Sequence, residues 1–156
     1  MQETKMKFYL AGPVGYGPEG TTWKDDIKCI LRSKGHEVYD PIENDGKYPD
    51  VLKMNIFKFD PKKYYKEIHQ IMQEIFFDDC DYITNCNYLI CYFSGRSYGT
   101  VSEQGIAYYL NKFLHKNIQT ISIFSEEFSP DEWVLCCSNH VFFSKEDALA
   151  FLQEIK

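Results

Sequence analysis

The feature of this chain that most constrains its fold is the alternation of short apolar runs with longer helical patterns. Alternation of this kind predicts a parallel sheet with helices on both faces and right-handed crossovers. The run NYLICYF (87–93) is almost continuously apolar, which is typical of a central strand that is covered on both sides. The expected strands are residues 6–11, 36–41, 87–93, 118–124 and 140–143, and the expected helices are 23–34, 62–83, about 100–114, 129–137 and 145–155.

Five strands in an α/β chain favour the order 2-1-3-4-5, which is the flavodoxin-like order. In that order the winding direction reverses between strands one and three, and ligands bind beyond the carboxyl ends of these strands. The loops that follow them, 12–20 and 94–99, both contain glycine. The sequence therefore predicts a ligand crevice between these two loops.

Capping residues predict where several helices begin and end. Thr21 or Thr22 is expected to cap the first helix and Gly35 to end it. Ser129, with Pro130 after it, and Ser144 are expected to cap the last two helices. Residues 42–62 carry several Asp, Asn, Gly and Pro and are expected to form a long loop. In the helix of 62–83, an apolar face is expected from Tyr65, Ile68, Ile71, Met72 and Ile75.

Length and composition favour a single domain over residues 1–156 with one core. The net charge of -6 and the lack of a long Lys or Arg run argue against binding of duplex nucleic acid, whereas one small anionic ligand remains possible. The six cysteines form no C-x-x-C, which favours reduced thiols in a cytoplasmic protein. Neither a signal peptide nor an apolar run of about 20 residues is present, so no membrane span is expected.

The stretch SYGTVSEQG (97–105) places a glutamate at the expected start of a helix. Thr100 and Glu103 match the capping box, in which the two side chains satisfy free backbone N–H groups. That interpretation makes Glu103 a structural residue. The predicted topology instead places Glu103 at the ligand crevice, which a surface cap does not require.

Three segments together resemble the nucleoside 2-deoxyribosyltransferase family. They are FYLAGP at the first strand, DDCDYITNCNYLICYF leading into the third, and GTVSEQGIAYYLNK after it. The family includes base-exchanging transferases and related enzymes that hydrolyse nucleoside 5'-monophosphates. The resemblance covers most of the chain, and it implies the five-stranded architecture already expected from the alternation.

By this resemblance Glu103 is the nucleophile that attacks the anomeric carbon of deoxyribose. The free N–H groups of a helix N-terminus would then keep its carboxylate ionised near neutral pH. Asp79 corresponds to the family residue that protonates or hydrogen-bonds the leaving base, although Asp81 takes that place if the register slips by two. Tyr9 corresponds to a tyrosine that orients the nucleophile. No metal and no organic cofactor is implied.

The resemblance also implies residues that bind the substrate, which would be a small nucleoside or nucleotide. Gly12, Pro13, Gly15 and Gly99 border the expected crevice. Asn139 corresponds to an asparagine that reaches into the site of a neighbouring subunit and binds the 5' end of the nucleoside. The expected assembly is therefore a homodimer or a higher homo-oligomer with shared active sites.

One departure from the transferase pattern leaves the substrate open. Ser97 stands where the transferases carry an Asp for the 5'-hydroxyl, and the monophosphate hydrolases have Ser there. Arg96 adds a possible positive partner for a phosphate. The AGP loop of residues 11–13 favours a transferase, so deoxyribosyl transfer is the leading interpretation and monophosphate hydrolysis the second. A non-catalytic nucleotide-binding sensor on the same fold is a third.

Overall fold

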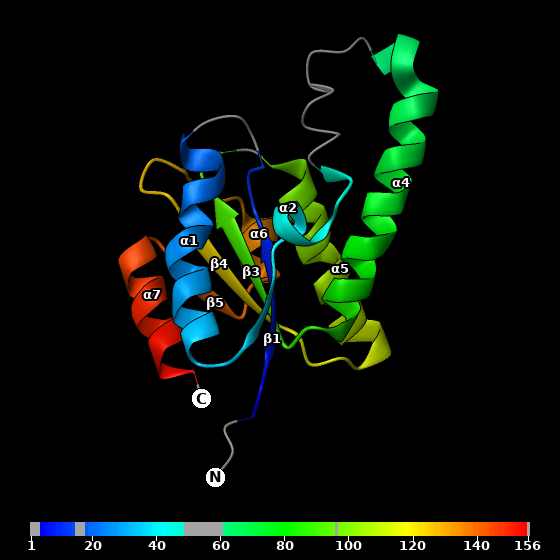
Figure 1. Ribbon diagram of the computed structural model, residues 1–156. Helices are drawn as coiled ribbons and strands as arrows, with labels where there is room; N and C mark the ends of the chain where they lie inside the picture. Colours follow the sequence, from blue (N-terminus) through cyan, green and yellow to red (C-terminus); the bar gives the residue numbers. More distant parts are fainter. Residues whose placement is uncertain (1–3, 15–17, 49–60, 96, 156) are drawn as a thin grey trace.

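The computed structural model describes residues 4–14, 18–48, 61–95 and 97–155. Its five strands form one parallel sheet in the order β2-β1-β3-β4-β5, which confirms the predicted fold (Figure 1). The strands are β1 (Lys7–Ala11), β2 (Glu37–Tyr39), β3 (Tyr88–Phe93), β4 (Gln119–Phe124) and β5 (His140–Phe142). The helices are α1 (Pro18–Ser33), α2 (Pro41–Asn44), α4 (Pro61–Asn85), α5 (Tyr98–Leu114), α6 (Glu132–Cys136) and α7 (Lys145–Glu154).

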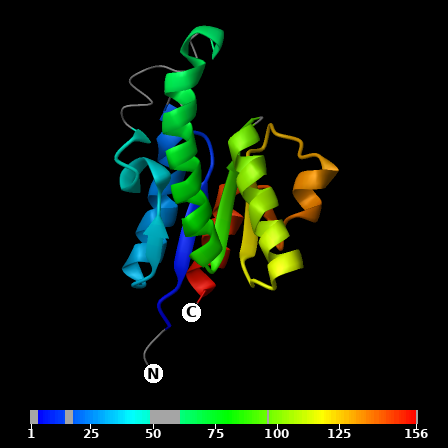
Figure 2. The same cartoon turned by 90° about the vertical axis from the view of Figure 1, so that its right-hand side faces the viewer.

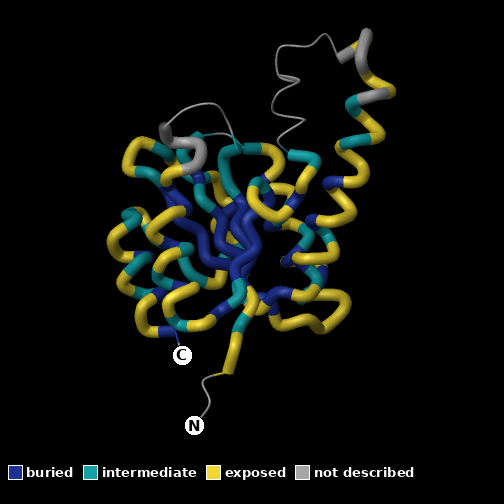
Figure 3. The backbone as a smooth tube through the Cα atoms, in the orientation of Figure 1, coloured by how far each residue is buried: buried dark blue, intermediate teal, exposed yellow. Residues whose placement is uncertain are grey.

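Two helical layers sandwich the sheet. Helices α1 and α7 pack together on one face, and α4 and α5 cover the other (Figures 1 and 2). Alternate side chains of each strand point to opposite faces, so Phe8 and Leu10 join the α1–α7 core while Tyr9 and Ala11 join the α4–α5 core. Most residues of β1, β3 and β4 are buried, and these strands form the centre of the molecule (Figure 3). Tyr9 therefore points toward the helix layer that carries Glu103.

Glycine is required at two turns next to the sheet. Gly35 ends α1 with φ +82°, a left-handed conformation that other residues adopt at a cost. At Gly12, just after β1, an added Cβ would lie 2.4 Å from the ring of Trp23. The indole of Trp23, on α1, can therefore pack directly on the backbone of residue 12 only because glycine has no Cβ.

Some helix boundaries differ from those expected. Helix α1 begins at Pro18 rather than after Thr21 or Thr22, because proline suits the first turn of a helix. Helix α6 begins after Asp131, whose carboxylate accepts from the N–H of Val134, and not at Ser129. Ser144 does cap α7, as predicted. The loop expected over residues 42–62 begins instead with the short helix α2, which Asp40 caps.

The apolar face expected on α4 is only partly buried. The amino-terminal half of α4 extends beyond the sheet (Figure 1), so Tyr65 is 60% exposed and Met72 is 36% exposed. The buried stripe lies in the carboxyl-terminal half and consists of Ile75, Asp79 and Ile83. A carboxylate thus occupies a core position of this helix. No helix among the described residues is long and apolar enough to cross a membrane.

Candidate active site

The centre of the site is a short hydrogen bond between two elements that are far apart in sequence. The hydroxyl of Tyr9, on β1, donates to Oε1 of Glu103, on α5, at 2.6 Å. Because Tyr9 is buried in a central strand and Glu103 projects from the helix that follows β3, the sheet topology brings the two residues together. The bond fixes the orientation of the Glu103 carboxylate.

Glu103 is not part of a capping box. The N-cap of α5 is Ser97, whose Oγ accepts from the N–H of Thr100 at 3.4 Å and lies 2.7 Å from the hydroxyl of Thr100. Helix α5 therefore begins three residues earlier than expected, and Glu103 lies in its second turn. The structural interpretation of Glu103 as a cap is wrong, and its carboxylate instead contacts Tyr9.

Asp79 lies in the same cavity as Glu103. Its Oδ2 accepts from the hydroxyl of Tyr48 at 3.3 Å, and its Oδ1 is buried without a hydrogen-bond partner in the described part of the chain. A buried carboxylate oxygen without a partner is costly for the fold, and such groups often mark functional sites. Asp79 therefore offers one oxygen to a ligand while Tyr48 holds the other.

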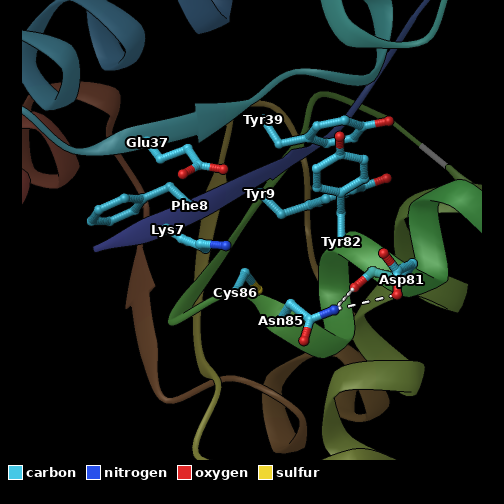
Figure 4. A pocket seen from close by; sticks show the side chains of 9 residues that line it. All are labelled: Lys7, Phe8, Tyr9, Glu37, Tyr39, Asp81, Tyr82, Asn85 and Cys86. Atoms are coloured by element: carbon cyan, nitrogen blue, oxygen red, sulfur yellow. Dashed lines mark hydrogen bonds between the residues drawn. The ribbon is translucent and has the colours of Figure 1, made fainter. Parts of the chain in front are cut away.

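Asp81 lies elsewhere. Its side chain turns toward Asn85 one helical turn on, and the amide of Asn85 donates to Oδ1 of Asp81 at 3.3 Å (Figure 4). Both residues line a second, separate pocket beside β2. Of the two candidate acids, the structure thus places Asp79, and not Asp81, beside Glu103.

Three tyrosine rings, those of Tyr9, Tyr39 and Tyr82, line the second pocket (Figure 4). The ring of Tyr39 stacks on Tyr9 with centroids 5.3 Å apart and on Tyr82 with centroids 3.5 Å apart. Stacked aromatic rings pack rigidly. The stack therefore holds the ring of Tyr9 in place, and with it the hydroxyl that contacts Glu103.

The cavity around the two carboxyl groups has a volume of about 200 Å³. Its polar groups lie together at Glu103, Asp79 and Tyr48, and most of the remaining wall is apolar. Gly99 also lines it, and a Cβ added there would meet no atom within 4 Å. The apolar side chains of the wall are Met72, Ile75, Phe76, Ile83 and Ile106.

Burial raises the pKa of both carboxyl groups. For Glu103 the pKa rises to about 8, because burial and the negative charge of Asp79 outweigh the hydrogen bond from Tyr9 and the positive charge of Lys24. For Asp79 burial raises the pKa to about 6, against the effect of the Tyr9 and Tyr48 hydroxyls. Burial therefore opposes the stabilisation of the Glu103 carboxylate that is expected from the helix N-terminus.

The two tyrosines of the site remain hydrogen-bond donors at any ordinary pH. Burial, together with the charges of Glu103 and Asp79, raises the pKa of Tyr9 far above its usual value. The pKa of Tyr48 is raised by burial and then by the charges of Asp79 and Glu103. Each carboxyl group thus faces a hydroxyl that stabilises its ionised form without competing for its proton.

The other predicted site residues are placed as follows. Gly12 and Pro13 lie just after β1, at the carboxyl edge of the sheet. Gly15 and Arg96 lie outside the described residues. Asn139 lies away from Glu103: its Oδ1 accepts from the N–H of Thr120 at 2.8 Å, and it lines a different pocket, between α5 and α6.

Sequence reasoning missed Tyr48 and Tyr39. Tyr48 lies in the Asp- and Asn-rich stretch after β2, where no periodicity singles out one residue. Tyr39 is the last residue of β2, in a strand-like run of the sequence. Its position at the carboxyl end of a strand was the signal that could have pointed to a place near the site. Among the described residues, no group of three or more His, Cys, Asp or Glu side chains is placed to hold a metal ion.

Comparison with known proteins shows the family and the fold. The family model described as nucleoside 2-deoxyribosyltransferase matches residues 8–134. No curated protein matches the chain. A solved structure, the CMP N-glycosidase BcmB of Clostridium botulinum, shares the fold: it is 19% identical, with 94% of this chain and 96% of that chain covered and a TM-score of 0.53. Since the family model spans most of the sequence, the chain belongs to the nucleoside 2-deoxyribosyltransferase family, whose enzymes act on N-glycosidic bonds.

Proposed function

We propose that this protein cleaves the N-glycosidic bond of a 2'-deoxyribonucleoside and transfers the deoxyribosyl group to another base. The observation that carries the proposal is the 2.6 Å bond from Tyr9 to Glu103 in a cavity that also contains Asp79. Two carboxyl groups in one largely apolar cavity, each with its own tyrosine donor, match the requirements of a nucleophile and a general acid.

The reaction has two balanced steps. In the first, a carboxylate oxygen of Glu103 bonds to C1' as the bond from C1' to the base breaks, and the leaving base takes the bonding electrons and a proton from Asp79. In the second, a nitrogen of the acceptor base attacks C1', the ester to Glu103 breaks, and Asp79 recovers a proton from the acceptor. Tyr9 donates to Glu103 throughout and holds its orientation.

The cavity wall favours a base over water as the acceptor. Met72, Phe76 and Ile106 present apolar surface on which a planar base can pack. Oδ1 of Asp79, which lines the same cavity, has no hydrogen-bond partner among the described residues and can bond the base. A base is thus held beside C1' more favourably than a water molecule in the same place.

The proposal is tested by base exchange. Incubation with each of the four deoxynucleosides plus a different free base should yield the exchanged deoxynucleoside, separated by chromatography. With the acceptor omitted, release of free base should be much slower. Fast base release that does not depend on the acceptor would identify a hydrolase, and no release from any deoxynucleoside or its monophosphate would leave the sensor interpretation.

Hydrolysis of a deoxynucleoside 5'-monophosphate is the second candidate. It is favoured by Ser97, which stands at the N-terminus of α5, where free N–H groups attract anions. The hydroxyl of Ser97 already bonds Thr100, so a phosphate there would be met chiefly by backbone N–H groups and by the Ser97 hydroxyl as a donor. A carboxylate in place of Ser97 would repel it.

Ser97→Asp separates the two candidates because it changes the charge and keeps the cap: Asp is as good an N-cap as Ser. If the natural substrate is a monophosphate, the ratio of kcat/KM for monophosphate over nucleoside should fall about ten- to a hundredfold in Ser97→Asp. Ser97→Asn, which also caps but carries no charge, serves as the control. An unchanged ratio in both variants would remove Ser97 from phosphate recognition.

We also propose that the active enzyme is a homodimer or a larger homo-oligomer in which Asn139 serves the site of a neighbouring subunit. Asn139 lies at the amino end of β5, away from the cavity of its own chain. It can therefore contribute to catalysis only across an interface.

A further inference from the structure

A buried glutamine follows Glu103 on α5. Gln104 is 1% exposed and shares the buried side of the helix with Ala107 and Leu110. An amide is costly to bury unless it is hydrogen-bonded, so a core position of a helix is usually apolar. The contacts of the Gln104 amide therefore decide what this residue does in the fold.

The amide of Gln104 joins α5 to two other elements. Its Nε2 donates to the hydroxyl of Ser122, on β4, at 3.0 Å, and to the carbonyl oxygen of Val134, on α6, at 3.1 Å. The same nitrogen lies 3.0 Å from the hydroxyl of Ser138, just after α6. One buried side chain thus ties α5 to both β4 and α6.

Glu103 and Gln104 hold α5 on the two sides of β3. In the sheet β3 lies between β1 and β4. Glu103 accepts from Tyr9 on β1, and Gln104 donates to Ser122 on β4. Consecutive residues of an α-helix point about 100° apart, so two neighbours can reach two different strands. Because hydrogen bonds require a narrow range of distance and angle whereas apolar packing is non-directional, the two contacts together fix the rotation of α5 about its axis.

We propose that Gln104 is a positioning residue: its amide sets the rotation of α5 at which Glu103 accepts from Tyr9. The inference rests on the proposed function, in which Glu103 is the nucleophile. A side-chain end that lies about 6 Å from the helix axis moves by about 1 Å when the helix turns by about 10°. A misplacement of about 1 Å at a reacting group can lower the rate about a hundredfold.

The partners of Gln104 would stay hydrogen-bonded without it. The hydroxyls of Ser122 and Ser138 lie 2.8 Å apart, and the hydroxyl of Ser138 also donates to the carbonyl oxygen of Val134 at 2.8 Å. Leaving a buried polar group without any partner is the costly event, and removal of the amide leaves none of these three in that state. An apolar side chain of the same length should therefore keep the fold and lose only the anchor of α5.

The test is Gln104→Met, which keeps the unbranched length of the side chain, with Gln104→Leu as a second variant. The kcat of base exchange should fall about ten- to a hundredfold, because the attack geometry is lost. KM should stay within about twofold, since the residues that line the cavity are unchanged. The melting temperature should fall by no more than about 5 °C.

Asn111→Leu is the matched control on the same helix. The amide of Asn111 donates to the carbonyl oxygen of Ile118 at 2.7 Å and accepts from its N–H at 2.8 Å, beyond the carboxyl end of α5. Its loss removes a partner from two backbone groups, so the melting temperature should fall at least as far as in Gln104→Met. The kcat of this control should nevertheless stay within about twofold of wild type.

The hydroxyl proton of Tyr9 reports the same geometry without catalysis. A proton in a short hydrogen bond resonates far downfield in 1H NMR, and its loss in Tyr9→Phe assigns the signal. The signal should move upfield in Gln104→Met and stay in place in Asn111→Leu. An unmoved signal in both Gln104 variants, or a kcat in the active enzyme that falls no further than in Asn111→Leu, would overturn the inference. A moved signal in a protein that cleaves no deoxynucleoside or monophosphate would reject the proposed function and keep the positioning of Glu103.

Discussion

Replacing Glu103 by Gln is expected to reduce cleavage of the glycosidic bond by at least about a thousandfold, because the amide cannot form the ester with C1'. Gln keeps the size of the side chain and an oxygen that can accept from Tyr9, so the fold should be retained. Since Glu103 does not cap α5, no capping energy is lost. The measurement is release of free base in steady state, with circular dichroism to verify folding.

The matched control is Glu154→Gln, the same chemical change at an exposed position of α7. It should retain full activity. A slow substrate analogue should also label the wild-type protein with one deoxyribosyl group on the peptide that contains Glu103, as seen by mass spectrometry. Near-normal turnover by Glu103→Gln, or a sugar attached at another residue, would remove Glu103 from the role of nucleophile.

The sheet could be predicted from the sequence because its signals are local and redundant. Most strands are short apolar runs such as NYLICYF, and Gly35 and Ser144 mark helix boundaries that the structure confirms. The helix boundaries that were predicted wrongly lie where the sequence carries competing signals. Pro18 can begin a helix, yet the glycines around it are typical of a loop, and the helix signal prevailed.

The site was less predictable because it depends on long-range contacts and burial. Glu103 and its partner Tyr9 are 94 positions apart, and only the topology brings them together. A helix N-terminus, which lowers the pKa of Glu103, is visible in the sequence, whereas the burial that raises this pKa is not. Tyr48 has no periodic neighbours that would reveal its contact with Asp79.

Burial of Glu103 also has a measurable effect on stability, and its sign follows from the pKa. The folded-state pKa of about 8 lies above the ordinary value of 4.5, so the contribution of this group is fully present below pH 4.5. It is lost as the pH rises to about 8, since the unfolded chain releases the proton first. Glu103→Gln has no proton to lose at this position and should escape that loss.

The free energy of unfolding of Glu103→Gln, relative to wild type, should therefore grow steadily between about pH 4.5 and pH 8. The full shift corresponds to about 5 kcal/mol, which is the upper limit of the difference because Glu103 is only partly buried. Urea unfolding of both proteins at several pH values measures this difference in the free energy of unfolding. The other titrating groups are the same in the two proteins, so their contributions largely cancel. Glu154→Gln should follow wild type at every pH. A difference that stays flat across this range would mean that Glu103 is ionised in the free protein, and the helix N-terminus would then outweigh burial after all.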